Sequence, residues 1–213
     1  GTTGAPKCIV HCAGGALLQH LKEHRLHTNI KSNDVVFYFS TCGWMMWNWL
    51  VSVLASEATI LLYDGSPFHP KSTALLDIAD QEKVSILGVS AKYISAIEKS
   101  GLKPRHSHKL DKMHTILSTG SPLTHGGFEY IYKSFSPDVQ LSSISGGTDI
   151  LSAFVAGNPY MPVCSGEIQC KTLGMDVQIW SDMGDSIIEE KGELVCVNPF
   201  PSAPIYFWND PGD

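Results

Sequence analysis

Short apolar runs alternate with stretches of helical period through the first two thirds of the chain, and this pattern constrains the fold most. We expect five strands, at Asp34–Phe39, Thr59–Tyr63, Ser85–Val89, His114–Ser118 and Val139–Ile144. Between them, apolar side chains recur at helical spacing around residues 75–82, 93–97 and 128–135. Strand and helix in alternation predict an α/β fold, with a mostly parallel sheet and flanking helices.

The pattern changes after Asn158, where short apolar runs are separated only by turn sequences. We expect strands at Glu167–Cys170, Met175–Trp180 and Glu193–Val197. Closely spaced strands of this kind are typical of a small antiparallel sheet or barrel. We therefore divide the chain into an α/β subdomain at residues 1–157 and part of a β-rich, barrel-like subdomain at residues 158–213.

Charge and composition exclude several partners. The chain has 15 basic and 21 acidic residues and a net charge of −6, whereas nucleic-acid-binding domains usually carry a basic face. The apolar stretch Trp44–Tyr63 contains the charge of Glu57 and is interrupted by Asn48 and Ser52, so it predicts a buried helix and strand rather than a membrane span. Six scattered cysteines without a C-x-x-C pair favour reduced thiols and a cytosolic location. We expect no nucleic-acid partner and no membrane partner.

The segment Gly1–Lys7, which reads GTTGAPK, has the composition of a phosphate-binding loop. Its two glycines allow close backbone approach, and its N–H groups and Thr hydroxyls can cradle phosphate oxygens beside the Lys7 ammonium. The spacing differs from the Walker pattern G-x-x-x-x-G-K-[ST]. A flexible turn or linker is the alternative interpretation of this segment alone.

With two further segments, this loop resembles the adenylate-forming superfamily of acyl-CoA synthetases, luciferases and peptide-synthetase adenylation domains. Ser118–Leu123 (STGSPL) resembles the loop that packs on adenine, and Ser145–Asp149 (SGGTD) resembles the motif that contacts the α-phosphoryl group and Mg²⁺. Each segment alone also occurs in ordinary turns. All three segments occur in the order that is expected along the chain. The second and third each come directly after an expected strand, where ligands of parallel sheets bind.

Within the superfamily the resemblance is to the acetoacetyl-CoA synthetase family, and it runs along essentially the whole chain. Thr41–Met45 resembles the segment that opens the acyl-pocket helix, and GEIQ, GELV and FWND resemble the β-rich part that follows. Acetyl-specific relatives carry Trp at the position of Gly146, so glycine there implies room for a longer acid. Asp149 departs from the usual Glu of the motif, which a hard cation with its waters can accommodate.

The resemblance implies roles for particular residues. Lys7 and Thr148 would act on the phosphoryl groups, Asp149 would help to hold Mg²⁺, and the acyl pocket would contain Trp44, Met45 and Gly146. The nucleotide would be bound by Gly1, Thr2, Thr3, Gly4, Lys7, Gly120, Ser121, Pro122, Ser143, Ser145, Thr148 and Asp149.

The implied reaction joins acetoacetate, ATP and coenzyme A into acetoacetyl-CoA, AMP and pyrophosphate through an acyl-adenylate. The chain would be an internal fragment that lacks the mobile C-terminal domain, and we expect no turnover from it alone. Alternatives are a synthetase for another short acid of the acetyl or propionyl type, and a catalytically dead adenylate-binding scaffold. A P-loop-like phosphotransferase is a third alternative, and it would release ADP rather than AMP.

Two other groupings suggest metal or acid–base chemistry. His20, Glu23 and His24 satisfy the H-x-x-E-H pattern of inverted zinc proteases. We expect instead that this face of the helix is solvated, with Leu17 and Leu21 on the buried face. A second group, Asp182, Asp185, Glu189 and Glu190, lies between expected strands and predicts a solvated hairpin tip.

Overall fold

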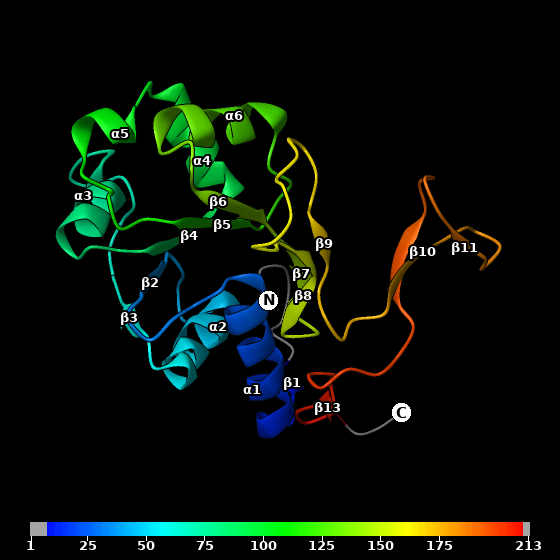
Figure 1. Cartoon of the computed structure of the whole chain (residues 1–213). Helices are drawn as coiled ribbons and strands as arrows, with labels where there is room; N and C mark the ends of the chain where they lie inside the picture. Colours follow the sequence, from blue (N-terminus) through cyan, green and yellow to red (C-terminus); the bar gives the residue numbers. More distant parts are fainter. Residues whose placement is uncertain (1–7, 211–213) are drawn as a thin grey trace.

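The computed structural model describes residues 8–210, and its centre is a five-stranded parallel sheet (Figure 1). In spatial order its strands are β3 (Thr59–Leu61), β2 (Val35–Tyr38), β4 (Ile86–Ser90), β5 (Thr115–Thr119) and β6 (Gln140–Ser143). Each expected strand is confirmed to within two residues at either end. The chain moves outward from β2 to β3 and then crosses back to β4, so the strand order reverses beside β2. In open parallel sheets, ligand-binding crevices lie at the carboxyl side of such a reversal.

Helices cover both faces of this sheet (Figure 1). One face carries α3 (Ala74–Gln81), α4 (Ala91–Lys99), α5 (Pro104–Ser107) and α6 (His125–Ser134). On the other side lie α1 (Ala13–Lys22), the π-helix η1 (Glu23–His27), α2 (Met46–Ser52) and the 3₁₀ helix η2 (Val53–Ser56). Alternation along β2 divides the core, because Phe37 packs with the α3–α6 layer while Val36 and Tyr38 pack with α2.

The apolar stretch at residues 44–63 folds as expected, into a buried helix followed by a strand. Met46, Trp49 and Leu50 of α2 are buried against the sheet, and the chain then enters η2 and β3. In the part of the chain that the structure describes, no helix combines the length and apolar character that crossing a membrane requires.

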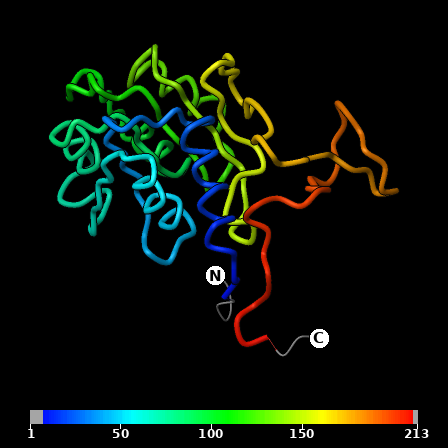
Figure 2. Tube along the Cα trace, turned by 60° about the horizontal axis from the view of Figure 1, so that its bottom comes forward, coloured from blue at the N-terminus to red at the C-terminus, as the bar shows by residue number. Residues whose placement is uncertain are grey.

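The remaining strands are antiparallel, as the short spacing after Asn158 predicts. They form three groups: β7 (Ser145–Gly147), β8 (Ser152–Ala156) and β9 (Cys170–Lys171); β10 (Val177–Trp180), β11 (Ser186–Ile187) and β12 (Glu193–Cys196); and β1 (Ile9–Val10) with β13 (Tyr206–Phe207). Figure 2 shows the β10–β11 segment projecting from the body of the molecule, and the chain then returning to lie beside β1. The acidic residues between and after β10 and β11 are exposed, as expected.

Several elements differ from the expectation. The strand expected at Glu167–Cys170 begins only at Cys170, because residues 167–169 run as a loop held by the Gln169 side chain. The sequence pattern gives no indication of β7, β8 or α5. Strand β9 pairs with β8, so one small sheet joins segments on either side of residue 157, and the division of the chain at that point stays a prediction.

The orientation of α1 and η1 is the reverse of the expected one. His20, Glu23 and His24 are buried, at 1%, 5% and 0% exposure, whereas Leu17 and Leu18 are 41% and 59% exposed. The expectation of a solvated polar face is therefore wrong. The polar side chains are buried because strand β8 and helix α2 supply hydrogen-bonding partners that the sequence alone does not reveal.

Candidate functional site

A cavity of about 450 Å³ opens at the carboxyl ends of β2, β5 and β6. Its walls come from the segment after β2, the loop after β5, and the chain that leaves β6 through β7. This volume lies in the range of roughly 300–1,000 Å³ that is usual for small-molecule sites.

The cavity brings together most of the residues that the sequence singled out. Those lining it are Trp44, Met45, Gly120, Ser121, Pro122, Ser143, Ser145, Gly146 and Thr148. Asp149 follows Thr148 in an exposed turn and does not line the cavity. The expected phosphate loop, with Gly1, Thr2, Thr3, Gly4 and Lys7, lies outside the described residues.

The loop after β5 is shaped by one hydrogen bond and one glycine. The Thr119 hydroxyl donates to the Ile144 carbonyl at 2.8 Å and so ties the end of β5 to the chain leaving β6. Gly120 then adopts φ = +90°, a conformation that strains any residue with a Cβ. Ser121 and Pro122 are thereby turned toward the cavity.

The β7–β8 hairpin presents Thr148 at its turn. Gly146 pairs with Ala153 and Gly147 with Ser152, and the Leu151 N–H closes the turn on the Thr148 carbonyl at 3.1 Å. A Cβ added to Gly146 would lie 2.2 Å from the Ser152 carbonyl oxygen. Glycine at this position is thus required for the close approach of β7 to β8. That it also widens the acyl pocket stays a prediction.

The wall formed by η1 was not expected from the sequence. Glu23, His27 and Thr28 all line the cavity and are 5%, 3% and 4% exposed. The H-x-x-E-H spacing does place polar groups on one helix face, so the signal was present. The sequence alone favours a solvated face, because nothing local shows that β8 and α2 cover it.

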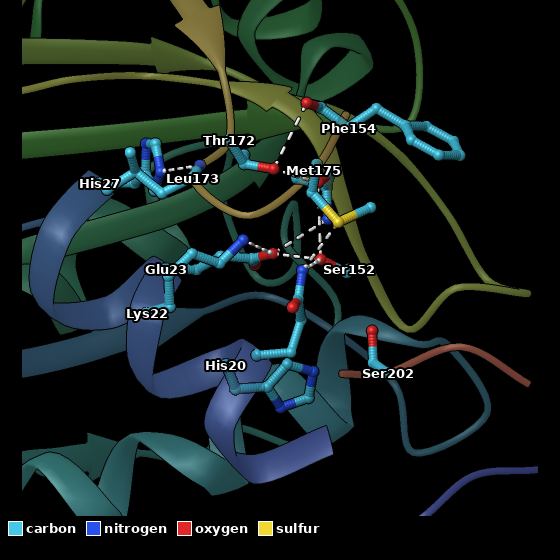
Figure 3. Close-up of polar contacts among 12 residues, drawn as sticks. His20, Lys22, Glu23, His27, Ser152, Phe154, Thr172, Leu173, Met175 and Ser202 are labelled. Carbon is cyan, nitrogen blue, oxygen red and sulfur yellow. Dashed lines mark hydrogen bonds and ion pairs between the residues drawn. The ribbon is translucent and has the colours of Figure 1, made fainter. Parts of the chain in front are cut away.

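Glu23 is the most connected side chain of this wall (Figure 3). Its Oε1 accepts from the Ser152 hydroxyl and from the Ala153 N–H at 3.1 Å, and its Oε2 accepts from Trp49 Nε1 at 3.0 Å. The Lys22 Nζ lies 3.7 Å from Oε1. All three hydrogen-bonding groups donate, which fits an acceptor-only carboxylate.

The histidines of η1 act as neutral hydrogen-bonding groups. Nδ1 of His27 donates to the Gly157 carbonyl at 2.8 Å, and its Nε2 accepts from the Leu173 N–H at 3.0 Å. Burial lowers the pKa of His27, and burial lowers the pKa of His24 to about 3. Among residues 8–210, no group of three or more His, Cys, Asp or Glu side chains is arranged to hold a metal ion.

Comparison with known protein families identifies the class of protein that has this fold and cavity. A family model described as AMP-binding enzyme matches residues 1–204. The chain therefore belongs to the AMP-binding enzyme family.

Similar proteins within this family include acetoacetyl-CoA synthetases of several organisms. The chain is 57% identical over 211 residues to an acetoacetyl-coenzyme A synthetase of Rhizobium meliloti, covering 99% of this chain and 32% of that protein. It is 54% identical over 210 residues to an acetoacetyl-CoA synthetase of Gallus gallus, again covering 32% of the relative. The chain thus spans about a third of the length of the curated relatives it matches.

Solved structures agree with these matches. The acetoacetyl-CoA synthetase of Streptomyces lividans superposes with a TM-score of 0.94 at 44% identity, covering 99% of this chain and 33% of that one. An anthranilate CoA ligase solved with anthranoyl-AMP superposes with a TM-score of 0.84 at 16% identity, which shows a shared fold.

Proposed function

We propose that this chain is the nucleotide- and acyl-binding part of an acid–thiol ligase that converts acetoacetate, ATP and coenzyme A into acetoacetyl-CoA, AMP and pyrophosphate. The convergence of the segments at residues 44–45, 120–122 and 143–148 on one cavity carries the proposal. The identity of 57% to an acetoacetyl-CoA synthetase supports the choice of acid, and we expect the reaction to take place in the cytosol. Coenzyme A would enter as a co-substrate in the second step.

The chemical problem is the attack of a carboxylate on the α-phosphorus of a polyanion. The exposed Thr148 hydroxyl at the cavity wall can donate to an α-phosphoryl oxygen, and Ser121, Ser143 and Ser145 offer polar groups to the nucleoside. Such prepositioned donors stabilise the charge that develops as pyrophosphate leaves. Lys7 would add a positive charge from the phosphate loop.

Mg²⁺ fits the donor chemistry at the Thr148 turn. Asp149 is an exposed carboxylate one residue from Thr148, and Mg²⁺ is usually bound by one or two carboxylates together with phosphate oxygens and water. When bound, the ion would offset repulsion between the carboxylate and the phosphates. Asp149 is the residue that would hold it.

The acyl group would occupy the part of the cavity beside Trp44, Met45 and Gly146. An acid of the acetyl or propionyl type is the alternative substrate, because one methylene changes transition-state binding by only about 1–3 kcal/mol. A dead scaffold would bind the adenylate without the catalytic parts that the longer relatives contain.

Calorimetric titration of the chain with Mg·ATP tests the proposed site. We expect wild type to bind, and Thr148→Ala to weaken binding about tenfold through the loss of one charge-assisted hydrogen bond. Thr59→Ala is the matched control, because Thr59 is exposed at the start of β3 and does not line the cavity. Equal losses in both variants would remove the support for a role of Thr148.

A further inference from the structure

We infer that Glu23 is a positioning residue for the Ser145–Asp149 segment, acting through strand β8. The inference deepens the proposed function and rests on it for the ligand, although its structural part can be measured without one. Three observations carry it: the partners of Glu23, the register of β7 on β8, and the π-helical backbone at Glu23 itself.

Two of the hydrogen-bonding partners of Glu23 are the residues that pair with the glycines of β7. Ser152 and Ala153 both hydrogen bond to Glu23 Oε1. In the register of the hairpin, Ser152 pairs with Gly147 and Ala153 pairs with Gly146. Glu23 therefore hydrogen bonds to β8 at the two residues that pair with Gly146 and Gly147. These glycines lead directly into Thr148.

The contact between β7 and β8 leaves little freedom at this point. The register shifts between Ser145 and Gly146, and β7 lies so close to β8 that even a Cβ at Gly146 would overlap the Ser152 carbonyl. Because the strands are in such close contact, a displacement of Ser152 and Ala153 would be transmitted to Gly146 and Gly147. The Thr148 hydroxyl would then move relative to the loop after β5, at residues 120–122.

One further donor holds Glu23, and another holds its partner Ser152. Trp49 Nε1 donates to its second oxygen from α2, and Gln19 Nε2 donates to the Ser152 hydroxyl at 2.7 Å. Glu23 begins the five-residue π-helix, a backbone form that often marks functional sites. Figure 3 shows the Glu23 and Ser152 side chains directed toward each other between α1 and β8.

The first test is hydrogen exchange on the chain without ligand, comparing wild type, Glu23→Ala and the control His24→Gln. His24 is buried on the same π-helix, but its hydrogen bond goes to the Trp49 carbonyl on α2. We expect amide protection at residues 145–156 to fall about tenfold or more in Glu23→Ala through loss of the Ser152 and Ala153 bonds. His24→Gln should leave protection there unchanged. Equal protection at residues 145–156 in wild type and a folded Glu23→Ala would overturn the inference.

The second test compares AMP with adenosine, because only AMP carries the phosphate that Thr148 would contact. We expect wild type to favour AMP about tenfold. Glu23→Ala should bring this ratio near one while adenosine affinity is retained, a selective change that general destabilisation would not produce. If affinity for both ligands falls equally, the positioning role is refuted.

A second substitution that restores function distinguishes a hydrogen-bonding role of Glu23 from the mere filling of space by its side chain. In Glu23→Gln, the amide oxygen can accept from Ser152 and Ala153 only if the amide NH₂ group faces Trp49 Nε1. Two donors would then face each other. Trp49→Phe removes that donor, so Glu23→Gln/Trp49→Phe should recover the AMP preference and the exchange protection that Glu23→Gln alone loses. A double variant no better than Glu23→Gln would contradict the proposed hydrogen-bond geometry.

The two proposals fail separately. Should Glu23→Ala not fold, Ser152→Ala removes one of the two β8 contacts and is expected to change exchange and AMP preference in the same direction. If wild type binds neither AMP nor adenosine while exchange follows the expected pattern, the proposed function is refuted and the anchoring of β7 and β8 by Glu23 stands.

Discussion

At the residue scale, burial converts ordinary titratable groups into fixed hydrogen-bonding groups. His24 is fully buried and donates from Nε2 to the Trp49 carbonyl, while its Nδ1 makes no hydrogen bond among the described residues. A charge on this ring would be desolvated without a compensating acceptor. The neutral form is therefore strongly favoured in the folded chain.

The buried histidines give stability a defined pH dependence. Burial lowers the pKa of His24 from 6.5 to about 3, so the unfolded chain binds the proton more readily than the folded one. The free energy of unfolding should thus fall as the pH drops below 6.5 toward about 3. Denaturant titrations between pH 7 and 4.5 measure this slope, which His24→Gln should reduce. An unchanged slope in the variant would show that other groups produce it.

Two glycines provide a matched pair for steric effects. Gly146→Ala places a methyl group 2.2 Å from the Ser152 carbonyl oxygen, whereas a Cβ at Gly14 of α1 has no neighbour within 4 Å. We expect Gly146→Ala to lower the free energy of unfolding by about 1–3 kcal/mol through overpacking. Gly14→Ala should leave it unchanged or raise it by up to about 1 kcal/mol, because alanine favours the helix. Thermal denaturation of both variants gives the comparison, and equal effects would contradict the strand contact.

At the element scale, Asp34 organises the amino ends of three neighbouring strands. Its carboxylate accepts from the Lys31 N–H at 2.7 Å, from the Ser85 hydroxyl at 2.8 Å and from His114 Nε2 at 3.0 Å. These residues precede β2, β4 and β5. Burial acts to raise the pKa of Asp34, but the hydrogen bonds from His114, Lys31 and Ser85 outweigh it and lower the pKa.

Removing this carboxylate should affect stability without affecting the cavity. We expect Asp34→Ala to lower the free energy of unfolding by about 1–3 kcal/mol, because the buried Ser85 hydroxyl and the more exposed Lys31 N–H and His114 ring lose a shared acceptor. Binding of Mg·ATP should remain near wild type, since the cavity lies at the opposite, carboxyl edge of the sheet. Asp138→Ala is the control, because Asp138 is exposed. A large loss of nucleotide affinity in Asp34→Ala would contradict this separation of the two edges.

The elements also show how far local pattern could predict the structure. The strands of the parallel sheet were predictable as short apolar runs, and the helices α3, α4 and α6 because each has apolar residues at helical spacing. The buried face of η1 was not predictable, because Glu23 and His27 hydrogen bond to Ser152, Ala153 and Gly157, more than a hundred positions away. The strand pattern pointed to the loops after the strands, and the family resemblance pointed to segments 120–122 and 145–148, which line the cavity. The π-helical wall depends on distant partners that neither indicates.

At the scale of the whole molecule, the sheet places three separate segments around one cavity, and the antiparallel hairpin β7–β8 closes it on one side. The carboxyl ends of the parallel strands form the base of the cavity, and β8 pairs with the glycines of β7. Glu23 connects β8 to helix α2 through its hydrogen bonds with Ser152, Ala153 and Trp49. The cavity is therefore a property of the assembled layers rather than of any one segment. We propose that the nucleotide and the acyl group share this cavity.

The most direct measurement of that claim is the affinity of the chain for a nonhydrolysable acetoacetyl-adenylate analogue relative to AMP. We expect the analogue to bind about tenfold more tightly or better, because its acyl end would bury apolar surface against Trp44 and Met45. Trp44→Ala should reduce the advantage while AMP affinity changes little. Equal affinity for the analogue and AMP in wild type would contradict a shared cavity.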